Sequence, residues 1–234
     1  MTELRLIRDD AEVAEHRLEL VVGAEHVPGL LWMPSGPQHG PRPTVLIAHG
    51  RGGHKRWRGT VSRARQFVVS HRWAAVALDA PGHGERRKPG SGLDELPPRP
   101  DPDQVVAEMT ACVDFLAGEG VLDATALGYL GLSMGTAMGI PFIAAHPRVR
   151  CAVLGLMHSR SERVCADAGS VSCPVLFVMN LEDERVPRAE ALELFDAIAS
   201  TDKRLHAYPG RHGQLPEEET AAAEQFLARY LTGA

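Results

Sequence analysis

Short apolar runs alternate with longer helix-like stretches along most of this chain, and this alternation constrains the fold more than any other feature. The runs are rich in β-branched residues, which is typical of strands buried on both faces of a sheet. The runs cover residues 44–49, 73–79, 127–132, 151–157, 175–180 and 204–208, and the helix-like stretches cover residues 61–71, 103–117, 134–146, 188–200 and 217–230. The sequence therefore predicts an α/β fold, with a mostly parallel central sheet and helices on both faces.

The start of the chain and the spacing of the later runs complete this outline. Residues 16–24 and 26–33 mix apolar and polar side chains around Gly23, which predicts an opening antiparallel hairpin. Only about fifteen residues separate the run at 151–157 from the next one, which is too short for an inserted cap domain. A chain of 234 residues fits one such unit, so we expect a single domain, residues 1–234, without a large cap.

Charge and composition argue against several classes of function. The formal net charge is -5, whereas a nucleic-acid-binding surface is normally basic. Residues 1–16 carry charges throughout, unlike a signal peptide, and no later run approaches the roughly 18 apolar residues of a membrane span. We expect a cytoplasmic protein without nucleic-acid or membrane partners. Its oligomeric state stays open, a homodimer included.

The four cysteines give no indication of a metal site. Cys112, Cys151, Cys165 and Cys173 form no C-x-x-C pair and lack the spacing of zinc ligands. Reduced thiols in packed positions are the simpler interpretation.

A Gly-x-Ser-x-Gly motif stands between a predicted strand and a predicted helix, at Gly131-Leu132-Ser133-Met134-Gly135. In this setting the serine lies on a sharp, strained turn, and the residues two before and two after it must be small. The turn raises the hydroxyl of Ser133 above the strand tips, beside the backbone N–H groups of the following helix. Ser133 is the candidate nucleophile.

A serine hydroxyl needs a histidine to accept its proton and a carboxylate to orient that histidine. Asp183 follows the run at 175–180 and is the candidate acid, although Glu182 and Glu184 are direct neighbours in the same loop. Of the two later histidines, His206 lies inside a strand-like run. His212 lies in a glycine-flanked loop before the last helix, which makes it the candidate base.

The negative charge of a tetrahedral intermediate requires two backbone N–H donors. Met134, directly after the nucleophile, supplies the first of these candidates. The second candidate is Arg51, because the glycine-rich sequence at 49–53 follows the first buried run and gives the backbone freedom to curve over the site.

Together, the sequences HGRGG, LDAPGHGE, GLSMG, DERVP and GRHG resemble the α/β-hydrolase superfamily in order and spacing, from about Leu18 to Leu231. Within it, the short layout without a cap resembles the dienelactone-hydrolase-like and small serine-esterase branch. Dienelactone hydrolases are known for a cysteine nucleophile and haloalkane dehalogenases for an aspartate, whereas this chain has Ser133.

The resemblance implies a Ser-His-Asp hydrolase that cleaves a carboxylic ester or thioester through an acyl-serine intermediate. Such chemistry requires no cofactor and no metal, and its partner is a small-molecule ester. Peptidase or acyltransferase activity on the same triad stays open, as does a non-catalytic scaffold of this fold.

Two further features bear on the substrate. The proline-rich connection at 82–102 follows a buried run, so we expect it to border the site. Basic residues concentrate in loops expected at the catalytic rim, which favours an anionic substrate, whereas an ordinary solvated surface is the alternative. They are Arg51, Lys55, Arg56, Arg58, Arg86, Arg87, Lys88, Arg160 and Arg163.

Overall fold

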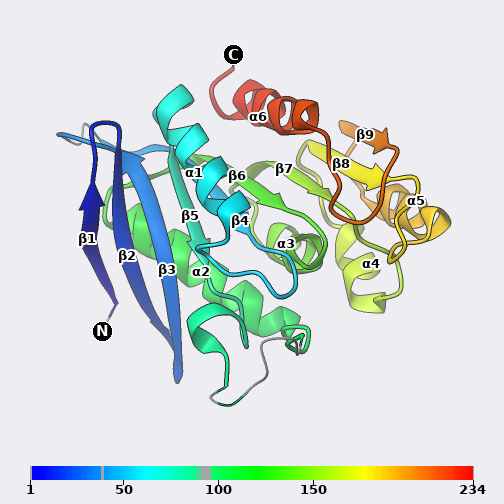
Figure 1. The fold of residues 1–234 in the computed structure, drawn as a ribbon, viewed down its shortest axis with the longest axis horizontal. Helices are drawn as coiled ribbons and strands as arrows, with labels where there is room; N and C mark the ends of the chain where they lie inside the picture. Colours follow the sequence, from blue (N-terminus) through cyan, green and yellow to red (C-terminus); the bar gives the residue numbers. More distant parts are fainter. Residues whose placement is uncertain (1, 38–39, 89, 91–95, 234) are drawn as a thin grey trace.

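The computed structural model describes residues 2–37, 40–88, 90 and 96–233, and these residues build one nine-stranded sheet with helices on both faces (Figure 1). The strands are β1 (Glu3–Asp9), β2 (Val13–Val22), β3 (Glu25–Pro34), β4 (Arg42–Ala48), β5 (Ala74–Leu78), β6 (Leu122–Gly131), β7 (Val149–Gly155), β8 (Val175–Asn180) and β9 (Lys203–Tyr208). The helices are α1 (Arg58–His71), α2 (Pro102–Gly118), α3 (Met134–Ala145), α4 (Glu162–Ala168), α5 (Arg188–Ala197) and α6 (Glu217–Leu231), with a 3₁₀ turn η1 (Gly84–Arg86).

The sheet order is β1-β2-β3-β5-β4-β6-β7-β8-β9. The pairs from β1 to β5 are antiparallel, and every pair from β5 through β4 to β9 is parallel. The expected mostly parallel sheet and opening hairpin are therefore confirmed. In such a sheet the loops after the parallel strands gather at one edge, which is where ligands bind.

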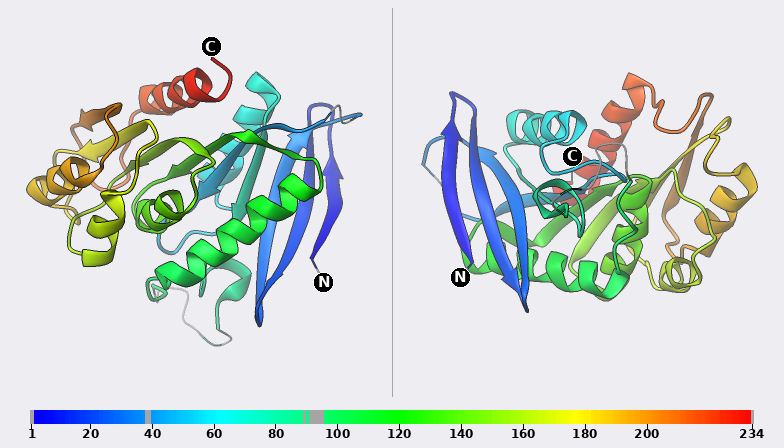
Figure 2. Two further views of the ribbon diagram at one scale, coloured as in Figure 1. Left: turned by 180° about the vertical axis from the view of Figure 1, so that it is seen from behind. Right: turned by 60° about the horizontal axis from the view of Figure 1, so that its bottom comes forward.

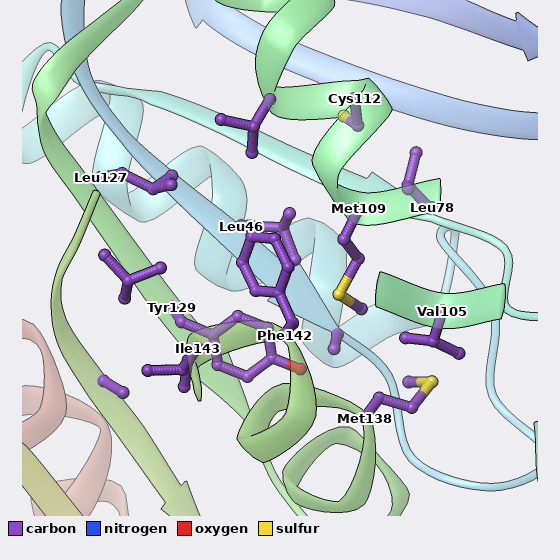
Figure 3. Close-up of a cluster of buried hydrophobic side chains, with 14 of the residues drawn as sticks. Leu46, Leu78, Val105, Met109, Cys112, Leu127, Tyr129, Met138, Phe142 and Ile143 are labelled. Atoms are coloured by element: carbon purple, nitrogen blue, oxygen red, sulfur yellow. The ribbon is translucent and has the colours of Figure 1, made fainter. Parts of the chain in front are cut away.

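Helices α1 and α6 cover one face of the sheet, and α2, α3, α4 and α5 cover the other (Figure 2). Helix α2 begins where Asp101 caps it, because the Asp101 Oδ1 atom accepts hydrogen bonds from the backbone N–H groups of Asp103 and Gln104. On this face, side chains of α2 and α3 pack on those of the central strands (Figure 3). They include Leu46, Leu78, Val105, Met109, Cys112, Leu127, Tyr129, Met138, Phe142 and Ile143.

Two elements go beyond the sequence-based outline. Strand β1 is almost wholly exposed. Because it has no buried apolar face and charged residues alternate along it, the sequence alone does not identify it as a strand. Helix α4 is one short segment between β7 and β8, capped by the Ser161 hydroxyl, which accepts the N–H of Val164 at 3.3 Å. Because α4 has only seven residues, this position holds no large cap, as expected.

Candidate active site

Ser133 lies on a tight turn between β6 and α3. Its backbone has φ 57° and ψ -118°, a conformation that few non-glycine residues adopt. The N–H of Ser133 donates to the carbonyl oxygen of Gly155 on the neighbouring strand β7 at 2.9 Å. This bond fixes the strained turn against the sheet.

The two glycines of the motif are required by close packing. A Cβ atom on Gly131 would lie 2.7 Å from the Gly135 carbonyl oxygen, and one on Gly135 would lie 2.8 Å from the Ala48 carbonyl oxygen. Both contacts are with backbone, which cannot move aside as a flexible side chain would. The buried Tyr129 also holds the turn, because its hydroxyl donates to the Gly135 carbonyl oxygen at 2.6 Å.

The structure brings Ser133, His212 and Asp183 together from three separate loops. The His212 Nε2 atom lies 3.0 Å from the Ser133 Oγ atom, and the His212 Nδ1 atom lies 2.8 Å from the Asp183 Oδ2 atom. The side chains of His212 and Asp183 are 10% and 1% exposed, so water competes little for these hydrogen bonds. This geometry fits a nucleophile, a base and an orienting acid.

The acidic neighbours of Asp183 occupy different positions. Asp183 Oδ1 accepts the backbone N–H groups of Arg185 and Val186 at 2.8 and 3.0 Å, which locks its carboxylate toward His212. Glu184 instead accepts the backbone N–H of His212 at 3.0 Å, and this hydrogen bond lowers the pKa of Glu184 to about 2. Glu182 is exposed. Of these three acidic residues, only Asp183 contacts the imidazole ring of His212.

His206, the other histidine considered for the base, lies on β9 away from the serine. Its Nδ1 atom is 2.8 Å from Glu219 Oε2, which also accepts the Tyr208 hydroxyl at 2.7 Å. These contacts join β9 to α6 and give His206 a structural position.

The two candidate oxyanion donors both border the serine. Met134 is the first residue of α3, so its N–H has no acceptor within the helix. Arg51 lines the same cleft as Ser133, and its Nε atom donates to the Pro97 carbonyl oxygen at 2.8 Å. The proline-rich connection therefore packs on the loop that carries Arg51, although residues 89 and 91–95 of that connection lie outside the described residues.

Buried groups hold the Arg51 loop. His49, the first residue of the HGRGG sequence, has the structural role that we expect of it, since it is 4% exposed and its Nε2 atom accepts the Ala80 N–H at 3.2 Å. Asp79 is fully buried and binds both the backbone N–H and the Nζ atom of Lys55, at 2.8 and 2.5 Å. Sequence reasoning missed this pairing, because a lysine in a glycine-rich loop looks exposed in the sequence and Lys55 was counted among the basic residues of the rim.

Most of the basic residues predicted at the rim are paired with carboxylates. Arg56 contacts Glu15, and Arg86 lies 2.7 Å from Glu108 and 2.9 Å from Glu25. Arg160 and Arg163 similarly form ion pairs with Glu190, Asp103 and Asp167. Carboxylates therefore neutralise much of the positive charge expected from these loops. Arg51, which lines the cleft, donates to a backbone carbonyl oxygen instead, and the preference for an anionic substrate stays a prediction.

The site opens into a cleft of about 520 Å³. One wall comes from the Arg51 loop and the start of α1, and the other from the His212 loop and the start of α6. The lining residues are Ile47, Ala48, His49, Gly50, Arg51, Gly53, Trp57, Gly59, Thr60, Arg63, Leu130, Leu132, Ser133, Leu156, Arg185, His212, Gly213, Leu215 and Thr220. Within the described ranges, no three histidine, cysteine or carboxylate side chains are grouped to hold a metal ion, and no helix is long and apolar enough to cross a membrane.

The sequence model of the Dienelactone hydrolase family matches residues 27–231. Among solved structures, a cold-adapted esterase from an Arctic intertidal metagenomic library is 32% identical, with a TM-score of 0.84 over 96% of this chain and 97% of that one. An acetyl xylan esterase from Paenibacillus sp. R4 shares the fold at 19% identity, with a TM-score of 0.77 over 98% of this chain and 89% of that one. No curated protein sequence matches. Because the family match spans most of the sequence and the esterase likeness extends over nearly the full length of both chains, this chain belongs to the dienelactone hydrolase family.

Proposed function

We propose that this ester hydrolase works through an acyl-serine intermediate, with Ser133 as nucleophile, His212 as general base and Asp183 as the acid that orients the histidine. The substrate is a small-molecule carboxylic ester or thioester. The observation that carries the proposal is the continuous hydrogen-bonded chain from Ser133 Oγ through His212 to Asp183, at the edge where the parallel strands end.

In the first half-reaction, His212 Nε2 takes the hydroxyl proton as Ser133 Oγ attacks the ester carbonyl carbon. The carbonyl oxygen becomes an oxyanion, and the N–H groups of Met134 and Arg51 are the proposed donors to it. Collapse of this intermediate breaks the bond to the alcohol oxygen. His212 gives its proton to that oxygen, and the acyl group stays on Ser133.

In the second half-reaction, His212 takes a proton from water while the water oxygen attacks the acyl carbon. The bond to Ser133 Oγ then breaks, and the proton returns to Ser133. Throughout, Asp183 keeps His212 in the tautomer that carries hydrogen on Nδ1 and accepts protons at Nε2.

Covalent labelling with a fluorophosphonate probe tests the nucleophile directly. We expect the folded wild-type chain to carry the label on Ser133, and the Ser133→Ala variant to remain unlabelled and to lose at least 10³-fold in kcat on p-nitrophenyl acetate. Matching circular dichroism spectra and unfolding temperatures would show that both proteins are folded. Label on another residue, or a Ser133→Ala variant with more than a small percentage of the activity, would contradict the assignment.

A further inference from the structure

The turn that carries His212 is attached to the end of β8. Its two ends are Arg211 and Gln214, and the Gln214 N–H donates to the Arg211 carbonyl oxygen at 3.0 Å. Gly213 inside the turn has φ 78°, a backbone conformation that favours glycine. The imidazole therefore projects from a tight turn, and the position of this turn sets how far the ring lies from its two partners.

The side chain that attaches the turn to β8 is Asn180, the last residue of the strand. Its Nδ2 atom donates to the Arg211 carbonyl oxygen at 2.7 Å and, in a longer and weaker bond, to the Gln214 carbonyl oxygen at 3.4 Å. The side-chain NH₂ group has two N–H bonds, which matches the two acceptors. One amide thus holds both ends of the turn.

Asn180 also belongs to the segment that carries the acid. Asp183 follows it by three residues, at the same end of β8. The Glu182 N–H donates to the Gly210 carbonyl oxygen at 3.2 Å, so the loops after β8 and β9 still run side by side beyond the strands. The Asn180 amide extends this pairing to the histidine turn, and it therefore joins the segment with the base to the segment with the acid.

An asparagine is a costly residue at the end of this strand. The other five residues of β8 are apolar and buried. Asn180 is 2% exposed, and within the described ranges its Oδ1 atom has no hydrogen-bond partner. A buried carbonyl group without a partner destabilises the fold, and a leucine of similar size would avoid that cost. The two donors of the amide are the property that an apolar residue could not supply.

We propose that Asn180 is a positioning residue for catalysis: its amide holds the turn against β8, so that His212 stays within reach of both Ser133 and Asp183. This proposal rests on the proposed function, which makes His212 the base. Asn180 itself does not line the cleft, so it acts through the turn and not on the substrate. A displacement of about 1 Å in a catalytic group is enough to lower the rate about 10²-fold.

Glu184 also contacts this turn, but its contact gives weaker support. Its carboxylate accepts the His212 backbone N–H at 3.0 Å, and its side chain is 37% exposed. Water can replace an exposed acceptor, whereas it has little access to the buried Asn180 amide. Loss of the Asn180 donors should therefore displace the turn more than loss of the Glu184 charge.

Asn180→Leu tests the proposal, because leucine has nearly the same size but cannot donate a hydrogen bond. We expect kcat on p-nitrophenyl acetate to fall about 10²-fold, while KM changes by less than about threefold because the cleft keeps its lining. Val175→Ala is the matched control. It shortens a buried side chain at the other end of β8, so it should lower the unfolding temperature but keep kcat within about threefold.

Asn180→Ala is the second variant, because it removes the same donors but leaves a space instead of a packed leucine. Both variants should lose kcat to a similar extent. A loss in only one of them would trace to the packing of the new side chain and would overturn the proposal. A kcat within about threefold of the wild type in both variants, or a raised KM with unchanged kcat, would also overturn it.

Hydrogen exchange followed by mass spectrometry measures the attachment of the turn without requiring turnover. The backbone N–H groups of Arg211, His212 and Gln214 are all hydrogen-bonded. In Asn180→Leu, we expect peptides covering residues 209–216 to exchange about tenfold faster than in the wild type, with the strands unchanged.

Two results of this measurement would contradict the proposal. Unchanged exchange at residues 209–216 would show that the amide does not hold the turn, and faster exchange throughout β8 and β9 would show a general loss of stability. Faster exchange confined to the turn, together with a wild-type chain that hydrolyses no ester, would refute the proposed function but not the attachment of the turn by Asn180.

Discussion

Two neighbouring carboxylates, Asp183 and Glu184, both contact His212, but they contact different parts of it. Asp183 binds the imidazole at Nδ1, whereas Glu184 binds the backbone N–H. In the proposed mechanism, only the first contact sets the tautomer of the ring and stabilises the imidazolium that forms during the reaction. The second contact holds the loop in place. The two acids should therefore differ greatly in their importance for turnover.

We predict that Asp183→Asn lowers kcat on a p-nitrophenyl ester by about 10³- to 10⁴-fold, because the amide favours the wrong tautomer of His212. Glu184→Gln, the matched control in the same loop, should lower kcat by less than about tenfold, because Glu184 is exposed and its side chain contacts the His212 backbone N–H and Arg side chains. Steady-state kinetics with both variants decides the point. A larger loss in Glu184→Gln or in Glu182→Gln would move the acid to that residue.

The residues at the centre of the candidate site were predictable because each lies in a short sequence pattern that is typical of its local structure. Ser133 stands in a turn that tolerates only glycine at Gly131 and Gly135, and His212 follows the last parallel strand in a glycine-flanked loop. Arg63 was not predictable in this way. In the sequence it is one of several arginines on a surface helix, and only the folded structure shows that it loses solvent and faces the cleft.

At the scale of loops and strands, Asp79 joins the loop of the proposed oxyanion hole to the segment after β5. It accepts the backbone N–H and Nζ of Lys55, and its Oδ2 atom also accepts the Glu85 N–H at 2.9 Å. Lys55 is 2% exposed, so its charge depends on this carboxylate and on Glu85, whose Oε1 atom lies 2.6 Å from the Lys55 Nζ atom. The position of Arg51 thus depends on an ion pair whose residues do not line the cleft beside Ser133.

Asp79→Asn should destabilise the protein by about 3 kcal/mol, because the amide NH₂ would face donors and leave the Lys55 charge poorly compensated. It should also lower kcat by about tenfold with little change in KM, since the Arg51 loop loses its support. Urea unfolding and steady-state kinetics measure the two effects. In the comparison variant Glu85→Gln, Lys55 loses a contact of 2.6 Å but keeps Asp79. The Glu85 side chain is 45% exposed, so the expected loss of stability is below about 1 kcal/mol.

The long elements were the most predictable part of the fold, and the edge of the sheet was the least. Helix α3 and the central strands stand out as nearly continuous apolar runs, because they are buried on almost all sides. Strand β1 is exposed, and α4 buries only Val164 and Ala168, so neither leaves a strong apolar pattern. Tertiary contacts, rather than local sequence, determine whether such short or exposed segments form a helix or a strand.

Across the whole molecule, burial disfavours the protonated form of several histidines. Desolvation lowers the pKa of each, and some of their ring nitrogens have no hydrogen-bond partner in the part of the chain described by the structure. An added proton at such a site would introduce a buried charge without compensation. The histidines concerned are His16, His49, His83, His146 and His158.

The effect is large for His49, because burial lowers the pKa of its imidazole from 6.5 to about 4. Its Nε2 atom accepts the Ala80 N–H, so Nδ1 carries the hydrogen and donates to the Gly50 carbonyl oxygen at 2.9 Å. A second proton on Nε2 would point at the Ala80 N–H. The neutral ring therefore fits the end of β4, and the charged ring does not.

We predict that the free energy of unfolding decreases as the pH falls from 7.5 to 5, by about 2 kcal/mol from His49 alone. Between its unfolded and folded pKa values, the unfolded chain binds a proton at His49 that the folded chain excludes, so acid favours unfolding in this window. Asp10 and Glu184, whose backbone hydrogen bonds lower their pKa values to about 2, lose their contributions only at lower pH. Urea unfolding at both pH values measures the change.

His49→Gln should reduce the pH dependence by about 2 kcal/mol, whereas His26→Gln, at a side chain 69% exposed, should leave it nearly intact. An equal pH dependence in wild type and His49→Gln would show that the folded protein accommodates the His49 proton.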